Sequence, residues 1–244
     1  MIFKTAFISK AGGRESNQDF CGNVSIDDKN KHCWVITDGL GSHRGGERAS
    51  KIVVNKIIEL FKNSPEITNE NLEYQLIKAN EEIVMLQAEN DSFSDMKTTV
   101  IEAICDNENL VCGHIGDSRF YHFRENKLFY QTLDHSVPQT MVTAGELSFE
   151  EIRKHPDRNR LLRSMGNKEG IKPSFYSSKI IINDKFLFCT DGFWEYVTEI
   201  EMEFDLAKSE TPEMWLEEME LRLLKKVKND FDNYSAIAVF ISPF

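Results

Sequence analysis

The stretch FLFCTDG, residues 186–192, carries four apolar residues directly into Thr190-Asp191-Gly192. The same pattern occurs in CWVITDG, residues 33–39, where Asp38 and Gly39 take the corresponding places. A short apolar run that ends in a turn signal is typical of a buried strand, and glycine allows a sharp turn after it. The two stretches therefore predict two buried strands, each followed by an aspartate at the edge of the core.

A carboxylate at the edge of a core is unfavourable unless it is paired, hydrogen-bonded or bound to a metal ion. A single Asp-Gly pair is explained well enough as an ordinary turn. Two copies, each after a buried strand, weaken that explanation and favour a shared function for Asp38 and Asp191.

The remaining pattern alternates runs of strands with blocks of helix. Helical spacing of apolar residues predicts helices at 46–61, 69–89 and 212–228. We expect strands at 2–9, 20–26, 33–37, 98–105, 110–116, 119–123, 127–131, 174–181, 185–190 and 234–241. This order indicates an α+β fold in which helices cover antiparallel sheets, rather than a parallel βαβ sheet.

Residues 134–172 interrupt the strands with a polar segment that contains prolines and glycines. So long a segment between strands is often functional, and we expect a flap beside a site, with two or three short helical pieces at most. No repeat or linker divides the chain, so residues 1–244 are expected to form a single domain.

The bulk composition excludes several classes of protein. The net charge of −11, from 29 basic and 40 acidic residues, argues against a general nucleic-acid binder, which needs a basic face. Five cysteines without a C-x-x-C pair predict reduced, buried thiols in a cytoplasmic protein. The apolar part of the N-terminus is too short for a signal peptide, and no apolar window is long enough for a membrane span.

Three further aspartates stand at expected strand ends: Asp19 in GRESNQDF, Asp117 in HIGDSRF and Asp232 in FDNYSAIAVF. Sheet pairing brings such ends together at one edge, and several carboxylates suit a hard cation such as Mg²⁺ or Mn²⁺. Gly39 offers its carbonyl oxygen as well, because no side chain blocks close approach. Each aspartate also has a simpler explanation, as a turn residue or as a partner of nearby polar groups.

The sequence resembles the PPM family of metal-dependent Ser/Thr protein phosphatases, also called PP2C-like, in its compact bacterial form. The resemblance covers nearly the whole chain in seven ordered segments: GGRESNQD (12–19), VITDGLGSHRGGERAS (35–50), KTTV (97–100), HIGDSRFYHF (114–123), LDHSVPQTMVTAGELSFEEIRKHPDRNRLLRSMG (133–166), FLFCTDGFWEYV (186–197) and DNYSAIAV (232–239).

The resemblance implies a fold and a metal centre. The fold is a four-layer α/β/β/α sandwich of two antiparallel sheets flanked by helices. Asp38 would bridge two Mn²⁺ or Mg²⁺ ions, and Asp191 and Asp232 would complete one of them. The Gly39 carbonyl and Asp19, partly through water, would hold the other. Asp117, sharing Asp191, would support a third, weaker ion.

The resemblance also implies the activity, a protein serine/threonine phosphatase acting on phosphoserine and phosphothreonine monoesters. Two metal ions together lower the pKa of a bridging water, and the resulting hydroxide attacks the phosphate directly, so no cysteine nucleophile is needed. The expected partners are phosphorylated proteins, namely substrates of a Ser/Thr protein kinase and the kinase itself, met by a monomeric enzyme. The alternatives are a catalytically weak regulatory or binding protein with this fold, and a different metallohydrolase on the same scaffold.

Arg14 and His43 are the expected catalytic side chains. Arg14 would clamp the substrate phosphate, because a guanidinium holds two oxygens at once. His43 fits the bacterial pattern DGxGGH with Ser42 in place of the second glycine, and is either a general acid or a supporting residue. Arg119 is expected to form a structural ion pair, and the alternative is that it contacts substrate. The flap arginines Arg158, Arg160 and Arg163 either contact phosphopeptide or form a solvated basic face.

Overall fold

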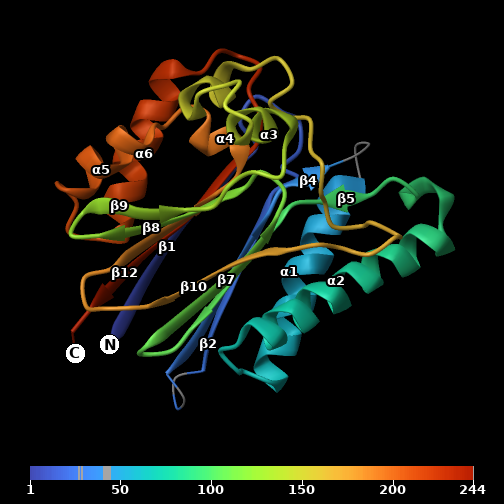
Figure 1. The fold of residues 1–244 in the computed structure, drawn as a ribbon, viewed down its shortest axis with the longest axis horizontal. Coiled ribbons are helices and arrows are strands. Elements are labelled where there is room, and N and C mark those ends of the chain that lie inside the picture. Colours follow the sequence, from blue (N-terminus) through green and yellow to red (C-terminus); the bar gives the residue numbers. More distant parts are fainter. Residues whose placement is uncertain (27, 29, 41–44, 244) are drawn as a thin grey trace.

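Two five-stranded antiparallel sheets stack face to face in the computed structural model, which describes residues 1–26, 28, 30–40 and 45–243 (Figure 1). The first sheet has the order β1 (Ile2–Lys10), β12 (Tyr234–Ser242), β11 (Lys185–Cys189), β8 (Arg119–Arg124) and β9 (Lys127–Gln131). The second has the order β10 (Ser174–Lys179), β7 (Asn109–Ile115), β6 (Val100–Cys105), β3 (Lys31–Thr37) and β2 (Phe20–Ile26).

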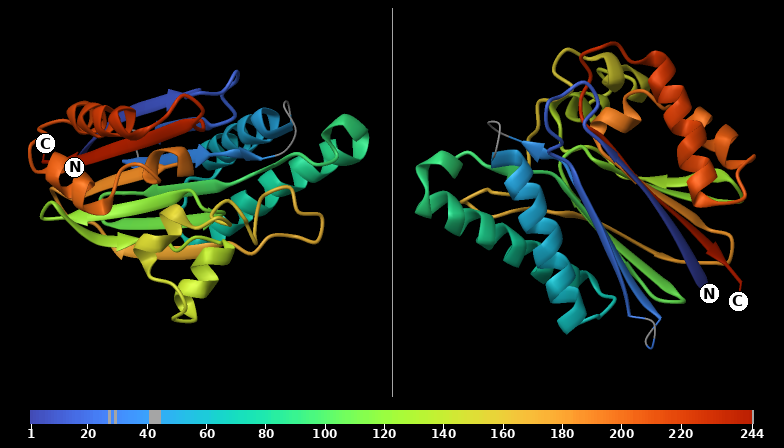
Figure 2. Two further views of the ribbon diagram at one scale, coloured as in Figure 1. Left: turned by 90° about the horizontal axis from the view of Figure 1, so that it is seen from above. Right: turned by 180° about the vertical axis from the view of Figure 1, so that it is seen from behind.

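Helices cover the outer face of each sheet, as Figure 2 shows from two sides. The long helices α1 (Gly45–Asn63) and α2 (Asn69–Glu89) lie on the second sheet, and α5 (Glu199–Leu206) and α6 (Pro212–Lys226) lie on the first. The four-layer α/β/β/α architecture and the antiparallel sheets are therefore confirmed. The described part of the chain has no helix long and apolar enough to cross a bilayer.

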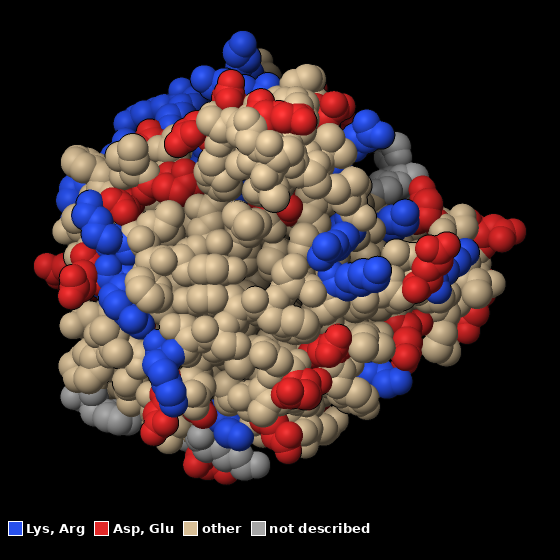
Figure 3. Space-filling view, in the orientation of Figure 1, with Lys and Arg blue, Asp and Glu red and all other residues tan. Residues whose placement is uncertain are grey.

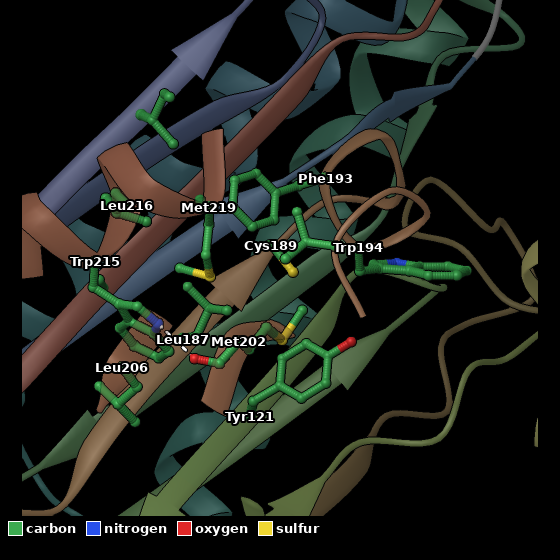
Figure 4. Close-up of a cluster of buried hydrophobic side chains, with 14 of the residues drawn as sticks. Tyr121, Leu187, Cys189, Phe193, Trp194, Met202, Leu206, Trp215, Leu216 and Met219 are labelled. Atoms are coloured by element: carbon green, nitrogen blue, oxygen red, sulfur yellow. Dashed lines mark hydrogen bonds between the residues drawn. The ribbon is translucent and has the colours of Figure 1, made fainter. Parts of the chain in front are cut away.

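The apolar runs that open the sequence are explained by burial on both faces of a strand. Side chains alternate between the two faces, so β3 sends Cys33 and Val35 toward α1 and α2, and Trp34 and Ile36 between the sheets. In β11, Leu187 and Cys189 face the α5–α6 layer (Figure 4), whereas Phe186 and Phe188 lie between the sheets. Both strands consequently read as continuous apolar runs.

Short elements connect these layers and surround one end of the sandwich. They are β4 (Gly39–Leu40), β5 (Lys97–Thr98), the 3₁₀ turns at Asp91–Phe93 and Phe149–Lys154, α3 (Val137–Thr143) and α4 (Asp191–Trp194). Residues 134–172 contain α3 and one of these 3₁₀ turns, within the two or three short helical pieces expected, and these two pieces lie beside α4 (Figure 1). The turn between β8 and β9 uses Glu125 and Asn126, both with positive φ.

The apolar periodicity of the sequence did not predict two of the helices, and it placed the end of a third helix two residues too late. The short α4 and α5 follow directly after β11, and α5 is fixed by a capping box in which Thr198 and Glu201 exchange hydrogen bonds. Such a box is a local signal, but α5 has too few turns for a clear apolar stripe. Helix α6 ends at Lys226 rather than at residue 228.

The surface charge is unevenly distributed. Figure 3 shows that charged side chains of this face gather near its periphery and leave a broad uncharged area in the middle. All five cysteines are free thiols, and four of them are buried, as the sequence predicted.

Candidate metal centre

The two Thr-Asp-Gly segments come from different sheets. Asp38 follows β3 of the second sheet, and Asp191 follows β11 of the first and opens α4. Their strands end at the same end of the sandwich, so both carboxylates line one open pocket of about 700 Å³. The repeated pattern therefore serves one site built across both sheets.

The main chain around Asp38 is held by the Thr98-Thr99 pair. The Asp38 N–H donates to Thr99 Oγ1 at 3.0 Å, and the Asp38 carbonyl accepts from the Thr99 N–H at 2.9 Å and from Thr98 Oγ1 at 2.8 Å. A Cβ on Gly39 would lie 2.5 Å from the Gly46 carbonyl oxygen at the start of α1. Only glycine fits there, which leaves the Gly39 backbone at the pocket wall.

Asp19 lies behind the pocket rather than in its wall. Its side chain is buried, and Oδ2 accepts a hydrogen bond of 2.9 Å from Thr190 Oγ1, the residue before Asp191. The other oxygen, Oδ1, is buried without a hydrogen-bond partner. A buried carboxylate oxygen in that state is unfavourable, and it suits a cation or a water molecule as its partner.

Asp117 and Asp232 also line the pocket, as does Glu15. Asp117 stands in the tight turn between β7 and β8, after Gly116 with φ +107°, and Trp194 Nε1 donates to its carbonyl at 2.9 Å. Asp232 precedes β12 and is more exposed than Asp117 or Asp191.

The carboxylates of this centre raise one another's pKa. Burial raises the pKa of Asp38 well above its usual value, and the charge of Asp191 adds to the effect. Burial likewise raises the pKa of Asp19 to about 7, and burial and then Asp232 raise that of Asp191 to about 6. Like charges gathered in a partly desolvated site need protons or cations to be stable. This electrostatic demand and the orphaned Asp19 oxygen both fit divalent cations with oxygen ligands.

The present side-chain positions are not those of a closed ligand cage. Across the described residues, no three His, Cys, Asp or Glu side chains converge on one point closely enough to hold an ion. Asp232 accepts instead from Arg14 Nε and Nη2, at 3.2 and 3.3 Å, and Asp19 is turned to Thr190. The donor set fits a metal centre, and in this structure Asp232 is paired with Arg14.

Arg14 is in the pocket wall, as expected for a phosphate ligand, and its side chain is half exposed. It also lies 3.5 Å from Asp230, and its hydrogen bond to Asp232 raises the guanidinium pKa. His43 falls outside the described residues.

Several residues of this region were not predicted from sequence. Asn233 Nδ2 donates to the carbonyls of Ala11 and Ser16, and its Oδ1 accepts from the Gln18 N–H, so it fastens the loop that carries Arg14. The sequence marked Asp232 as a candidate metal ligand, whereas Asn233 was visible only as its neighbour in a turn. The flap contributes Asn159 and Leu161 to the pocket wall, and no local pattern marked them.

Two of the three flap arginines, Arg158 and Arg163, have specific partners, whereas Arg160 is exposed. Arg158 Nε donates to Glu195 Oε1 at 2.6 Å, which ties the flap to the residue after α4. Arg163 donates to the Lys172 carbonyl. Arg119 is fully buried in a bidentate pair with Asp134, with both bonds at 2.8 Å, so its expected structural ion pair is present.

Comparison with known proteins places the chain among phosphatases. A family model described as protein phosphatase 2C matches residues 9–230. The serine/threonine phosphatase stp of Listeria welshimeri is 33% identical over 201 residues, 80% of this chain and 79% of that protein. The crystal structure of Stp1 from Staphylococcus aureus superposes with a TM-score of 0.89 at 28% identity, covering 100% of this chain and 96% of that one.

A structure of the PstP catalytic domain in complex with two manganese ions has the same fold. Its TM-score is 0.84 at 24% identity, and the match covers 99% of each chain.

Proposed function

The chain belongs to the protein phosphatase 2C family and is a protein serine/threonine phosphatase, and we propose that the pocket across the two sheets is its catalytic centre. Phosphatases of this family depend on metal ions. The single observation that carries the assignment is that Asp38, Asp117, Asp191 and Asp232 line one pocket, although they stand far apart in the sequence.

Two Mn²⁺ or Mg²⁺ ions would be held by Asp19, Asp38, the Gly39 carbonyl, Asp191 and Asp232. A third would be held by Asp117 and Asp191. When bound, such ions supply an activated water and offset the charge of both the carboxylates and the phosphate. The raised pKa values of Asp38 and Asp191 and the unpartnered Asp19 oxygen support this set.

The chain's own groups position and bind the substrate. Thr98 and Thr99 fix the main chain of Asp38, and Asn233 fixes the loop that carries Arg14. Arg14 presents a forked donor to the pocket, and this donor turns from Asp232 to the phosphate oxygens when substrate arrives. His43 is proposed as the general acid or a supporting residue.

Phosphorylated proteins are the proposed substrates, including those of a Ser/Thr kinase and the kinase itself, and the enzyme is proposed to act as a cytoplasmic monomer. The free state of all five cysteines supports a reducing compartment. The catalytically weak regulatory protein is not favoured, because relatives at about a third identity are named phosphatases.

The test is turnover of p-nitrophenyl phosphate and of a phosphothreonine peptide by the purified chain. We expect turnover with Mn²⁺ or Mg²⁺, reversible loss in EDTA, and no turnover in Asp38→Asn or Asp191→Asn with the fold retained. Asp91→Asn, an exposed aspartate of a distant 3₁₀ turn, is the matched control. Near wild-type turnover in Asp38→Asn would contradict the site, and hydrolysis of a phosphodiester in preference to the peptide would contradict the activity.

A further inference from the structure

The turn that carries Asp117 is held by a residue of the flap, and we propose that this residue, His135, is a positioning residue for Asp117. The inference rests on the proposed function, because it takes Asp117 to be a group of the catalytic centre. His135 itself lies on the other side of the turn, in the wall of a separate pocket of about 280 Å³. It acts on the centre through Gly116 and Asp117.

Both backbone hydrogen-bonding groups of Gly116 are satisfied by His135. The His135 N–H donates to the Gly116 carbonyl at 2.9 Å, and the Gly116 N–H donates to His135 Nδ1 at 3.2 Å. On the next residue, the Asp117 carbonyl accepts from Trp194 Nε1 at 2.9 Å. The peptide group before the Asp117 Cα is thus held by the main chain of His135, and the one after it by the side chain of Trp194. The His135 ring holds the peptide group one residue earlier, between Ile115 and Gly116.

The protonation state of His135 follows from these contacts. Because Nδ1 accepts the Gly116 N–H, the proton of the neutral ring must lie on Nε2. Nε2 lies 2.9 Å from Ser174 Oγ and donates a hydrogen bond to it. The ring also stacks on His114, with centroids 4.5 Å apart and an angle of 11° between the planes. Ser174 and His114 therefore fix the tautomer and the plane that Gly116 requires.

The segment that carries His135 is itself held by a buried ion pair. Asp134, the preceding residue, makes the buried bidentate pair with Arg119. The Arg119 guanidinium lies 3.5 Å from the centre of the Trp194 ring, the same ring that holds the Asp117 carbonyl. The positions of His135 and Trp194 are therefore coupled, and the turn between them has little conformational freedom.

Two amide substitutions separate positioning from general support. In His135→Asn the side-chain oxygen falls near the place of Nδ1 and keeps an acceptor for the Gly116 N–H. In His135→Gln the amide reaches instead toward Ser174, in the place of Nε2, and the Gly116 N–H loses its acceptor. A merely structural histidine would tolerate both changes or neither.

The first measurement is amide hydrogen exchange at Gly116 in the metal-free protein, which needs neither ion nor substrate. We expect exchange to rise by about fivefold in His135→Gln, the effect of losing one hydrogen bond of ordinary strength, and to stay near the wild-type rate in His135→Asn. His155→Gln is the control, since it removes a similar bond, from the Asp157 N–H to His155 Nδ1, elsewhere in the flap. Equal exchange in the Asn and Gln variants would overturn the proposal.

The second measurement is the kinetics of p-nitrophenyl phosphate with Mn²⁺. His135→Gln should lower kcat at little change in KM, and His135→Asn should restore it. If the wild type shows no metal-dependent turnover, the proposed function fails, whereas the exchange rates still decide whether His135 holds the turn.

Ser174→Ala carries the test if the His135 variants do not fold. Without Ser174, Arg163 Nη1, already 3.3 Å from His135 Nε2, can donate to that nitrogen, which forces the ring proton onto Nδ1 against the Gly116 N–H. Faster exchange at Gly116 in this variant supports the proposal, and unchanged exchange overturns it.

Discussion

Asp134→Asn tests the buried ion pair on which the flap side of the catalytic centre rests. The change keeps the side-chain shape but leaves the guanidinium of Arg119 without its counter-charge. Both partners are almost fully buried. Burial alone lowers the pKa of Arg119, but the charge and hydrogen bonds of Asp134 together with the contact with Tyr121 outweigh burial, so the pKa is raised. Removing one partner of such a pair typically costs about 3–5 kcal/mol.

The structure places the expected loss at the lower end of that range. Glu199 Oε1 lies 3.6 Å from Arg119 Nη1, and the Trp194 ring lies against the guanidinium, so part of the charge remains compensated. We expect a loss of about 3 kcal/mol. At about 2–4 °C per kcal/mol for a chain of this size, the melting temperature should fall by about 6–12 °C.

Urea unfolding followed by far-UV circular dichroism measures this loss directly. Glu81→Gln, which breaks the exposed pair with Lys78, is the control and should leave the midpoint unchanged. The double variant Arg119→Met/Asp134→Leu should be more stable than Asp134→Asn, because it leaves no buried charge unpaired. A loss below about 1 kcal/mol in Asp134→Asn would refute the reasoning.

Three further predictions follow from individual contacts. Arg14→Ala should raise KM for p-nitrophenyl phosphate by about 30–150-fold, the equivalent of a charge-assisted contact of about 2–3 kcal/mol, and an unchanged KM and kcat would contradict its role. Arg160→Ala should lower kcat/KM for a phosphoprotein more than for p-nitrophenyl phosphate. Arg158→Ala releases the flap from Glu195 and should lower kcat/KM for both substrates. Equal losses on the two substrates in Arg160→Ala would mean that the flap does not select substrates. Burial raises the pKa of Asp184, but its bidentate bonds to Arg124, its contact with His122 and its bond from the Ile181 N–H together outweigh burial and lower the pKa from 3.8 to about 2. Between those pH values the unfolded chain binds more protons, so stability falls as the pH drops through this window, and acid titration of the unfolding midpoint should show a weaker fall in Asp184→Asn.

Local sequence was sufficient for the elements that carry the site. The apolar runs of β3 and β11, each ending in Thr-Asp-Gly, identified the two strand ends and their aspartates, because burial and turn formation depend on adjacent residues. The helical spacing of apolar residues in the long helices α1 and α2 was equally clear from the sequence. The ordered motifs added the α/β/β/α architecture and the phosphatase activity through resemblance.

The tertiary structure alone decided which groups meet. No local pattern states that β3 and β11 belong to opposite sheets, or that Arg14 reaches Asp232, 218 positions away. The partners of Arg158 and Arg119, and the contact between His135 and Gly116, also depend on packing between distant segments. Strand order and side-chain partners are set by long-range burial and charge compensation. The sequence therefore identified the candidate residues of the site, and the packing of the two sheets determined which of them are in contact.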